Sequence, residues 1–509
     1  MNAQTLTVRN PATLEEIAEL PIASSAEVAA AVARGRKAQT LWQNTSFAER
    51  SRLLYRLRDL LLDEQDRLAD ILISETGKPR AEAYGNELFY LCNAIGHWAK
   101  KSANYLRPKR IRPHFLLLKA KKVVTLYAPR GVVGIISPWN FPLTLTLGEA
   151  LPALMAGNAV VIKPSELTPL SALFGAEVAA RAGFPENLLQ VVVGAGETAE
   201  ALIDQADMIA FTGSVETGKR VMRRAAERLI PVSLELGGKD PMIVLKDADL
   251  ERAAGACVWG ALMNAGQVCT SIERVYVEAP VYQPFVDKVV EKVRALRQGA
   301  GAEEADIGSM TSSAQLEKVA SQVDAAVAGG AKVLVGGRRN PRHKGYFYEP
   351  TVLVDVKPSM SVMTEETFGP IIPIAKVEDA EEALRLANDS RYGLSGAIFS
   401  RSAADSWRLA EKLQSGSLCI NDSLANFIIP DAPMGGTKES GFGYRHGAEG
   451  IRKFCQQKTI VIDRSGRKQE FPWYPASAKK TGQLRHLLRL LCRSGWSHKL
   501  RALKGLIKG

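Results

Sequence analysis

Residues 131–142 read Gly-Val-Val-Gly-Ile-Ile-Ser-Pro-Trp-Asn-Phe-Pro, a short apolar run followed by a turn. An uninterrupted apolar run of this length is typical of a buried strand in a parallel sheet. Three more such runs follow, at 159–162, 188–193 and 208–211. Helical stretches separate them, near 145–156, 168–182 and 197–204. Strands that alternate with helices predict parallel β-α-β units, in which ligands bind at the carboxyl ends of the strands.

A second alternating block extends from about residue 242 to residue 435. Its strand candidates are 241–244, 274–277, 394–399 and 417–421. Two such blocks predict an α/β fold with two domains and a cleft between them. The first hundred residues read as helices instead. Ser46 and Glu49 have the spacing of a capping box, and Gly77 followed by Pro79 ends a later helix.

The composition is that of a globular protein. The chain has 509 residues, 46% of them hydrophobic and 24% charged, which is enough for several domain-sized units. Its six cysteines are scattered, with no Cys-x-x-Cys pair and no histidine cluster, so we expect neither a disulfide framework nor a metal site. The sequence contains neither a secretory signal nor an apolar run of about 20 residues. A cytoplasmic location is therefore expected.

The net charge of +12 lies almost entirely in the C-terminal tail, residues 464–509, which has twelve Lys/Arg and one acid, Glu470. Four leucines follow helical spacing there, at 484, 487, 488 and 491, with arginines between them. A second apolar set, Trp496, Leu500, Leu503 and Ile507, predicts another helix. A basic amphipathic segment over 481–509 is consistent with peripheral association with an anionic membrane. It is equally consistent with packing on its own body or on a neighbouring subunit.

Three motifs contain the groups needed for a cysteine-based reaction. Cys269 closes the run Asn-Ala-Gly-Gln-Val-Cys, Glu235 opens Glu-Leu-Gly-Gly-Lys, and Asn140 lies in the turn after the first strand. A thiolate attacks a carbonyl carbon, an amide stabilises the oxyanion, and a carboxylate activates the water that hydrolyses the acyl-enzyme. Each residue alone is weak evidence, since a lone Cys is usually inert core. Together they are the three groups needed to oxidise an aldehyde through a covalent thioester.

In their order and in their amino-acid residues, these motifs resemble those of the NAD(P)-dependent aldehyde dehydrogenase superfamily. The resemblance extends over roughly residues 5–463. Supporting blocks are Phe-Thr-Gly-Ser at 211–214, Glu-Glu-Thr-Phe-Gly-Pro at 365–370 and Pro-Met-Gly-Gly at 433–436. Within the superfamily the chain is most similar to bacterial succinate-semialdehyde dehydrogenase-like members. CoA-acylating relatives lack a carboxylate where Glu235 stands, so the resemblance implies hydrolysis.

The resemblance also implies the architecture: two α/β domains, one of them a variant Rossmann coenzyme domain, and a β-hairpin that bridges subunits. A homodimer or homotetramer is therefore expected. The expected segments are a dinucleotide-binding domain of residues 1–106 and 130–235, a catalytic domain of 236–456, oligomerisation strands at 107–129 and 457–463, and the tail from 464 to 509.

The cofactor is expected at the carboxyl ends of the first set of strands. The usual Gly-x-Gly-x-x-Gly fingerprint is missing, but Gly213 to Gly218 follows a strand and precedes a helix, whose free N–H groups suit a pyrophosphate. By resemblance, the cofactor residues are Ile136, Ser137, Pro138, Trp139, Lys163, Glu166, Gly213, Ser214, Gly218, Leu236, Glu366 and Phe368. A carboxylate at Glu166 accepts from a ribose hydroxyl and repels a 2′-phosphate, so NAD is expected in preference to NADP.

The substrate tunnel is expected to be apolar. Its expected residues are Phe141, Gly148, Met263 and Phe427, with Gly148 leaving one wall open. Several semialdehyde enzymes of the superfamily place Arg six residues before the nucleophile, where this chain has Met263. The sequence therefore predicts a medium-chain, long-chain, aromatic or isoprenoid aldehyde, and succinic semialdehyde is the alternative.

A different class of function stays open, namely a catalytically silent structural or membrane-binding protein on the same fold. The intact Cys269, Glu235 and Asn140 argue against it. We expect no nucleic-acid partner, because the basic tail lacks the interleaved aromatic residues of a base-stacking surface.

Overall fold

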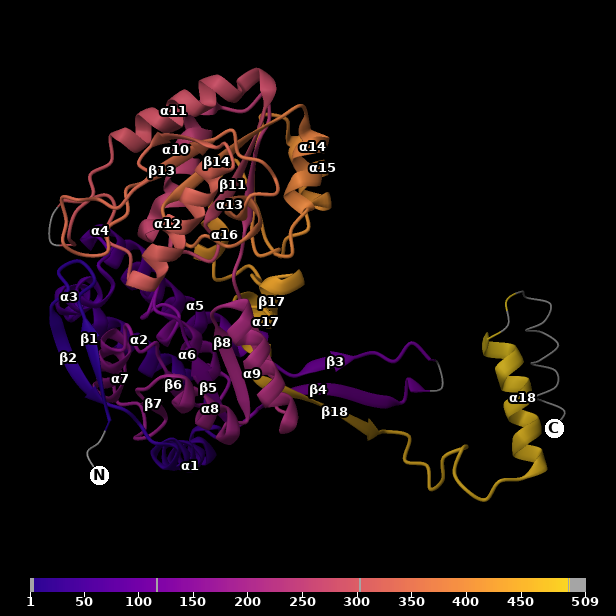
Figure 1. The fold of residues 1–509 in the computed structure, drawn as a ribbon. Coiled ribbons are helices and arrows are strands. Elements are labelled where there is room, and N and C mark those ends of the chain that lie inside the picture. Colours follow the sequence, from indigo (N-terminus) through magenta and orange to yellow (C-terminus); the bar gives the residue numbers. More distant parts are fainter. Residues whose placement is uncertain (1–3, 116–117, 302–303, 493, 495–509) are drawn as a thin grey trace. The chain divides into compact units, whose positions relative to one another are not determined.

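The computed structural model describes residues 4–115, 118–301, 304–492 and 494 (Figure 1). The chain forms two compact units. The first comprises Met1–Arg107 and Tyr127–Lys458, and the second comprises Pro108–Leu126 and Thr459–Gly509. The first unit, here called the body, contains two separate sheets.

The first sheet of the body has six strands in the order β17-β9-β8-β5-β6-β7. They are β5 (Val132–Ile136), β6 (Ala159–Lys163), β7 (Leu189–Val191), β8 (Met208–Thr212), β9 (Val232–Glu235) and β17 (Gly441–Phe442). All neighbouring pairs are parallel except β17 with β9. The four strands expected from the apolar runs are confirmed, whereas β9, whose residues Val-Ser-Leu-Glu form no such run, was not predicted.

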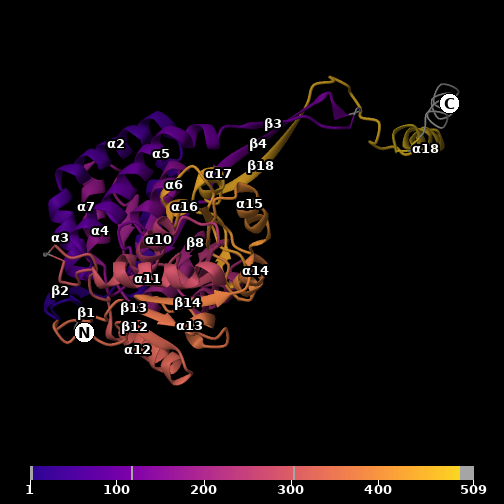
Figure 2. The same ribbon diagram turned by 90° about the horizontal axis from the view of Figure 1, so that it is seen from above.

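Helices connect these strands as expected. They are α6 (Leu147–Met155), α7 (Leu170–Arg181), α8 (Gly196–Gln205) and α9 (Val215–Glu227). The N-terminal helices α1 (Ser25–Trp42), α2 (Phe47–Asp63), α3 (Gln65–Thr76) and α5 (Tyr90–Tyr105) complete this half, and α2, α5 and α7 cluster together (Figure 2). Ser46 and Glu49 form the predicted capping box, and Gly77 ends α3 at φ +72°.

The second sheet of the body has seven strands in the order β12-β13-β14-β11-β10-β15-β16. They are β10 (Asp240–Val244), β11 (Ile272–Glu278), β12 (Lys332–Val335), β13 (Thr351–Val354), β14 (Ile371–Val377), β15 (Ala397–Phe399) and β16 (Cys419–Ile420). Only β12 and β13 pair antiparallel. Helices α10 (Leu250–Leu262), α11 (Tyr282–Arg294), α12 (Ser313–Ala328), α14 (Ala380–Asn388) and α15 (Ala403–Lys412) surround it (Figure 1).

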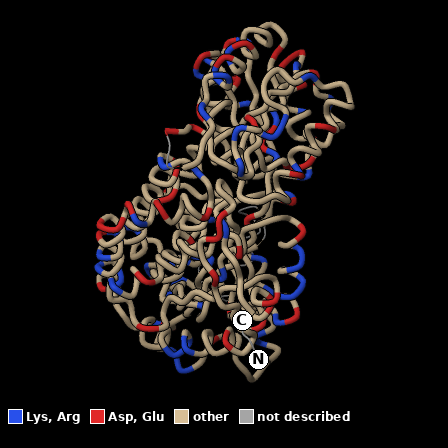
Figure 3. The backbone as a smooth tube through the Cα atoms, turned by 60° about the vertical axis from the view of Figure 1, so that its left-hand side comes forward, with Lys and Arg blue, Asp and Glu red and all other residues tan. Residues whose placement is uncertain are grey.

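Each sheet has its own hydrophobic core. One core gathers around β5, β6 and β8, and the other around β10, β11 and β14. This arrangement confirms the expected α/β class with two layered halves. Charged residues of both signs are interspersed along both halves (Figure 3). The division into domains at residues 235 and 236 stays a prediction, because both sheets belong to one compact unit.

The second unit includes the predicted hairpin, with strands β3 (Lys109–Ile111) and β4 (Lys121–Pro129), and most of β18 (Cys455–Asp463), in the order β18-β4-β3. Lys121 donates to Asp463 at 2.8 Å. The first predicted tail helix is present as α18 (Ala478–Cys492), whereas the second, around Trp496 to Ile507, lies outside the described residues. Within the described part of the chain, no helix combines the length and apolar character needed to cross a bilayer.

Candidate active site

The loops expected to bind a cofactor leave the carboxyl edge of the first sheet. β5 and β8 are neighbours, and the chain proceeds from β5 outward to β6 and β7 before it returns to β8. This reversal of strand order creates a topological switch point, where open α/β sheets bind ligands. Asn140 follows β5, Gly213 follows β8, and Glu235 is the last residue of β9.

Cys269 comes from the second sheet. It follows the 3₁₀ turn Met263–Gly266 and precedes β11, so it lies at the amino edge of that sheet. Asn264 and Ala265 in this turn have φ of +53° and +54°, a region that costs free energy for residues other than glycine. The backbone N–H of Asn264 donates to Glu82, and its side-chain amide donates to the Asn140 carbonyl oxygen at 3.0 Å. These contacts tie the cysteine loop to the first sheet.

Cys269 lines two cavities of the body. The first is an apolar tunnel lined by Gly85, Asn86, Phe89, Tyr90, Phe141, Leu145, Trp259, Met263, Val268, Cys269, Thr270, Leu424, Phe427 and Ile428. The second is a more polar cleft lined by Pro138, Trp139, Asn140, Leu145, Thr212, Gly213, Ser214, Glu235, Leu236, Gly237, Cys269, Gln315, Lys318, Glu366 and Phe368. The predicted residues Asn140, Glu235 and Cys269 therefore share one cleft.

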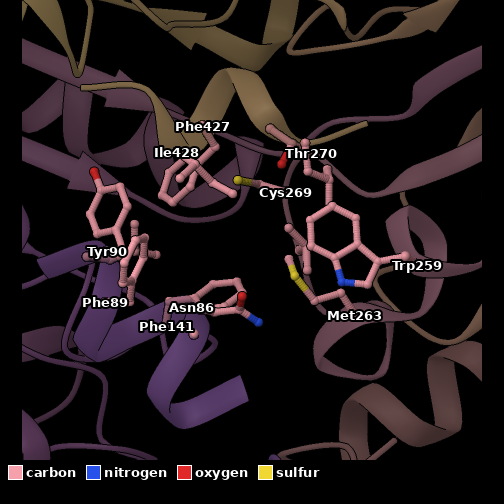
Figure 4. A pocket seen from close by; sticks show the side chains of 14 residues that line it. Asn86, Phe89, Tyr90, Phe141, Trp259, Met263, Cys269, Thr270, Phe427 and Ile428 are labelled. Atoms are coloured by element: carbon pink, nitrogen blue, oxygen red, sulfur yellow. The ribbon is translucent and has the colours of Figure 1, made fainter. Parts of the chain in front are cut away.

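The tunnel is enclosed mainly by aromatic and aliphatic side chains (Figure 4). Phe89 and Tyr90 lie on one side, and Trp259 and Met263 lie on the other. The ring of Tyr90 stacks on Phe427 with 4.9 Å between centroids. Phe141, Met263 and Phe427 line the tunnel as predicted.

The expected role of Gly148 is wrong. It does not line the tunnel, and a Cβ atom built at Gly148 would lie 3.4 Å from a ring carbon of Tyr90. Tyr90 therefore closes the wall that the glycine was expected to open. The Tyr90 hydroxyl is hydrogen-bonded to His446 at 2.7 Å, and burial lowers the pKa of His446 to about 3, which keeps that imidazole neutral.

Glu235 lies beside a buried cluster of charges. Its partner across the strand pair is Thr212, whose hydroxyl accepts a hydrogen bond from Arg445 at 2.8 Å. Arg445 and Lys453 both pair with Glu149, and both lower the pKa of Glu235, but burial dominates and raises it to about 7. A carboxyl group with a pKa near neutrality suits a general base.

The surroundings of Cys269 disfavour the ionised form of its thiol. Burial raises the pKa of Cys269 to about 12, and the neighbouring Glu235, Asp240 and Glu366 add to the increase, whereas Arg445 opposes it. Reactive cysteines usually have the opposite shift, caused by a nearby positive charge. A general base that accepts the thiol proton would assist attack by the sulfur, and Glu235 is a titratable carboxyl group lining the same cleft.

The remainder of the cleft fits a nicotinamide cofactor. The rings of Trp139 and Phe368 meet edge to face at 5.4 Å, and Glu366 accepts from the Gly238 N–H at 3.1 Å. A Cβ atom at Gly237 would lie 2.6 Å from the Glu366 carboxylate, so a side chain there would displace that carboxylate. Lys163, the last residue of β6, pairs with Glu166 at 3.2 Å, and the two supply a donor and an acceptor suited to ribose hydroxyls.

Helix α9 opens at this cleft, with Ser214 as its N-cap accepting from the Thr217 N–H. A Cβ atom at Gly218 would lie 2.5 Å from Leu236, so the glycine lets α9 approach β9 closely. Five predicted cofactor residues do not line the cleft itself, namely Ile136, Ser137, Lys163, Glu166 and Gly218. Gln315 and Lys318 of α12 line it and were not predicted, because nothing in their local sequence distinguishes an exposed helix from a cleft wall.

Comparison with known proteins agrees with this geometry. The model of the aldehyde dehydrogenase family matches residues 1–460. The "Putative succinate-semialdehyde dehydrogenase (NADP(+)) 2" of Mycobacterium tuberculosis is 42% identical over 463 residues, 90% of this chain and 89% of that protein. The "4,4'-diapolycopene aldehyde oxidase" of Methylomonas sp is 39% identical over 464 residues, 91% of this chain and 86% of that protein.

Solved structures show the same fold. The NAD+ complex of an aldehyde dehydrogenase from Bacillus cereus superposes with a TM-score of 0.86 at 35% identity, covering 90% of this chain and 93% of that one. The protein belongs to the aldehyde dehydrogenase family, as the sequence motifs indicated. It is an NAD(P)-dependent aldehyde dehydrogenase.

Proposed function

We propose that this enzyme oxidises an apolar aldehyde to its free carboxylic acid through a thioester on Cys269. The observation that carries the proposal is that Cys269 lines both the apolar tunnel and the polar cleft. A substrate in the tunnel presents its carbonyl carbon to the sulfur. A cofactor in the cleft lies on the other side of the same atom.

In this mechanism the Cys269 sulfur adds to the carbonyl carbon, and Glu235 accepts the thiol proton. The Asn140 amide and the backbone N–H of Cys269 stabilise the oxyanion, each donor lowering the barrier by about 3 kcal/mol. Bound NAD(P)+ supplies a hydride acceptor for the carbon attached to sulfur. Glu235, after losing its proton to solvent, then takes a proton from water, whose oxygen attacks the thioester and releases the acid and the Cys269 thiol.

The tunnel lining supports an apolar substrate. Met263 stands six residues before the nucleophile, and among the described tunnel residues none is charged. A carboxylate-bearing substrate such as succinic semialdehyde would bury its charge here without a cationic partner, which is costly. The hydroxyl groups of the lining belong to Thr270 and to Tyr90, whose hydroxyl is bonded to His446. The names of relatives do not decide between the two substrate classes, since one relative is named for succinic semialdehyde and another for diapolycopene aldehyde.

The mouth of the tunnel suggests a long substrate. Phe89, Trp259 and Ile428 line the tunnel and are nevertheless 64%, 44% and 38% exposed, so they offer apolar surface outside the enclosed part. A chain that extends past the tunnel would cover this surface and gain roughly 25 cal/mol for each Å² of apolar area removed from water.

A panel of aldehydes tests the proposal. We expect NAD(P)H formation with decanal, longer alkanals and retinal-like aldehydes, with kcat/KM at least tenfold above that for succinic semialdehyde. The Cys269→Ala variant is the control for the thioester and should be inactive. A higher kcat/KM for succinic semialdehyde would favour the alternative substrate, and no NAD(P)H with any aldehyde would favour the catalytically silent protein.

NAD is proposed as the preferred form of the cofactor. Glu166 is paired to Lys163 at 3.2 Å and has a half-exposed carboxylate, which would repel a 2′-phosphate. Comparison of kcat/KM for NAD and NADP tests this preference. The Glu166→Gln variant should have a smaller difference between its kcat/KM values for NAD and NADP. A clear preference of the unaltered enzyme for NADP would refute this role of Glu166.

Self-association is proposed through β18, in which Ile460, Val461 and Ile462 are exposed at 37%, 60% and 43%. Exposed strand residues of this kind pair readily with another chain. A homodimer or homotetramer in sedimentation velocity is expected. Monomers at micromolar concentration would contradict it.

A second role is proposed for the tail, namely binding an anionic membrane surface. In α18, Leu484 and Leu488 are exposed among basic residues, and the whole tail contains a single acid. Co-sedimentation with phosphatidylserine vesicles should be strong for the full chain and lost for a chain ending at Asp463. Equal sedimentation of both chains would exclude the tail as the membrane-binding segment.

A further inference from the structure

Two lysine–glutamate pairs lie fully buried beside the cleft, outside the groups that the mechanism uses. The first is Lys78 with Glu87, at 2.7 Å, and the second is Lys239 with Glu273, at 2.8 Å. The side chains of both lysines are 0% exposed. Buried ion pairs of this kind are poor sources of stability, because desolvating two charges costs about as much as their attraction returns. Their contacts indicate another role.

The first pair holds the loop that contains Asn140. The Lys78 ammonium donates to the Asn140 carbonyl oxygen at 3.0 Å and lies 4.5 Å from the centre of the Phe141 ring. Glu87 accepts the backbone N–H of Thr144 at 2.8 Å. One ion pair therefore contacts Asn140, Phe141 of the tunnel wall and the backbone of Thr144.

The second pair holds the loop that contains Glu366 and Phe368. Glu273 accepts the backbone N–H groups of Thr367 and Phe368, both at 2.7 Å, and Lys239 donates to the Thr367 hydroxyl at 2.9 Å. Phe368 has φ of +56°, a strained conformation for a residue with a side chain. The carboxylate of Glu273 stabilises this conformation, since the carboxylate accepts hydrogen bonds from both N–H groups of the strained turn.

We propose that the two buried pairs are separate positioning devices, Lys78–Glu87 for the oxyanion loop 140–144 and Lys239–Glu273 for the cofactor loop 366–368. None of the four residues touches the reacting atoms in this scheme. They act by fixing the backbone of the residues that do. A misplacement of about 1 Å in such a loop costs up to about 100-fold in rate. The inference rests on the proposed function, because it assigns a purpose to the geometry of that site.

A pair of neutralised double variants separates the two devices. Lys78→Met with Glu87→Gln removes the donor to Asn140 but keeps an acceptor for the Thr144 N–H. Lys239→Met with Glu273→Gln removes the ion pair and leaves one acceptor for two N–H groups. In each variant both charges disappear, so no unpaired charge remains buried.

Two measurements on each variant are compared with the unaltered enzyme: the rate of the NAD(P)H burst at saturating cofactor, and the Kd of the cofactor by titration calorimetry. The Lys78–Glu87 variant should lose about 10- to 100-fold in burst rate, with the Kd changed less than about twofold. The Lys239–Glu273 variant should raise the Kd about tenfold or more. An unchanged burst rate in the first variant, or an unchanged Kd in the second, would overturn the inference.

Hydrogen exchange of the unaltered protein tests the same contacts if a variant does not fold. The amides of Thr144, Thr367 and Phe368 should exchange at least about 100-fold more slowly than exposed loop amides. Exchange at the rate of free loops would overturn the inference. Failure of the proposed function can be distinguished from failure of this inference. If the proposed function is wrong, the unaltered enzyme gives no burst, but the Kd of the cofactor and the amide exchange rates still report on the two loops.

Discussion

The side-chain amide nitrogen of Asn140 lies 2.8 Å from the backbone carbonyl oxygen of Gln267, two residues before Cys269. One N–H of the amide is used in this bond, so the second N–H has a fixed direction in the cleft. The contact links the turn after β5 to the cysteine loop, 127 residues later in the chain. It orients Asn140 before any substrate arrives, as an oxyanion donor requires.

Replacement of Asn140 by Ala is expected to slow the first chemical step. Loss of one oxyanion donor costs about 100- to 1,000-fold in kcat. The rate of the NAD(P)H burst, measured by stopped flow, reports this step directly. Asn140→Asp is the matched control, since it keeps the size and loses the donor, and it should be at least as slow. A burst within twofold of the unaltered rate would exclude Asn140 from this role.

Replacement of Glu235 by Gln is expected to stall turnover at the acyl-enzyme. Gln keeps the shape of the side chain but cannot take a proton from water. Because Gln also cannot accept the thiol proton, the burst of one NAD(P)H per active site should be slower than in the unaltered enzyme, and the turnover that follows it should be reduced about 100-fold or more. Mass spectrometry of the quenched protein should find the acyl group on Cys269. Unchanged steady-state turnover would remove Glu235 from the mechanism.

The pH dependence follows from the pKa of Glu235, which burial raises to about 7. The base works only when it is ionised, so kcat should fall as the pH drops below 7 and level off above about pH 8. Measurement of kcat between pH 5.5 and 9 checks this expectation. A kcat that stays constant down to pH 5 would contradict it.

Arg445 is expected to set the position of that profile. The positive charge of Arg445 lowers the pKa of Glu235, whereas the negative charge of Glu149 raises it. Arg445 also pairs with Glu149 and so offsets part of that negative charge. Arg445→Met removes the favourable charge and frees Glu149, so the midpoint of kcat against pH should rise by about one pH unit. Lys453→Met should also raise this midpoint, but by a smaller amount than Arg445→Met. A downward shift in either variant would reject this electrostatic account.

Replacement of Met263 by Arg is expected to change the substrate preference. The guanidinium would stand in the tunnel wall and pair with a substrate carboxylate. We expect the KM for succinic semialdehyde to fall about tenfold and that for decanal to rise. Met263→Leu is the control for packing and should leave both constants within about threefold. An unaltered ratio of the two KM values in the Arg variant would show that residue 263 does not select the substrate.

Much of the fold could be predicted because it depends on local patterns. The apolar runs of β5, β6 and β8 and the capping box of Ser46 are set by neighbours in the sequence. β9 was not predicted, since Val232 and Leu234 alternate with Ser233 and Glu235 and form no continuous apolar run. The motif residues Cys269, Glu235 and Asn140 were identifiable because their types and order carry a known chemistry.

The sequence by itself therefore determined the α/β class, the family and the groups available for catalysis, since periodicity and residue type are local properties. The tertiary structure alone decided that Tyr90 closes the wall beside Gly148, that burial raises the pKa values of Cys269 and Glu235, and that two buried ion pairs hold the site loops. The physical reason is that desolvation and packing depend on segments brought together from distant parts of the chain, which no local pattern records.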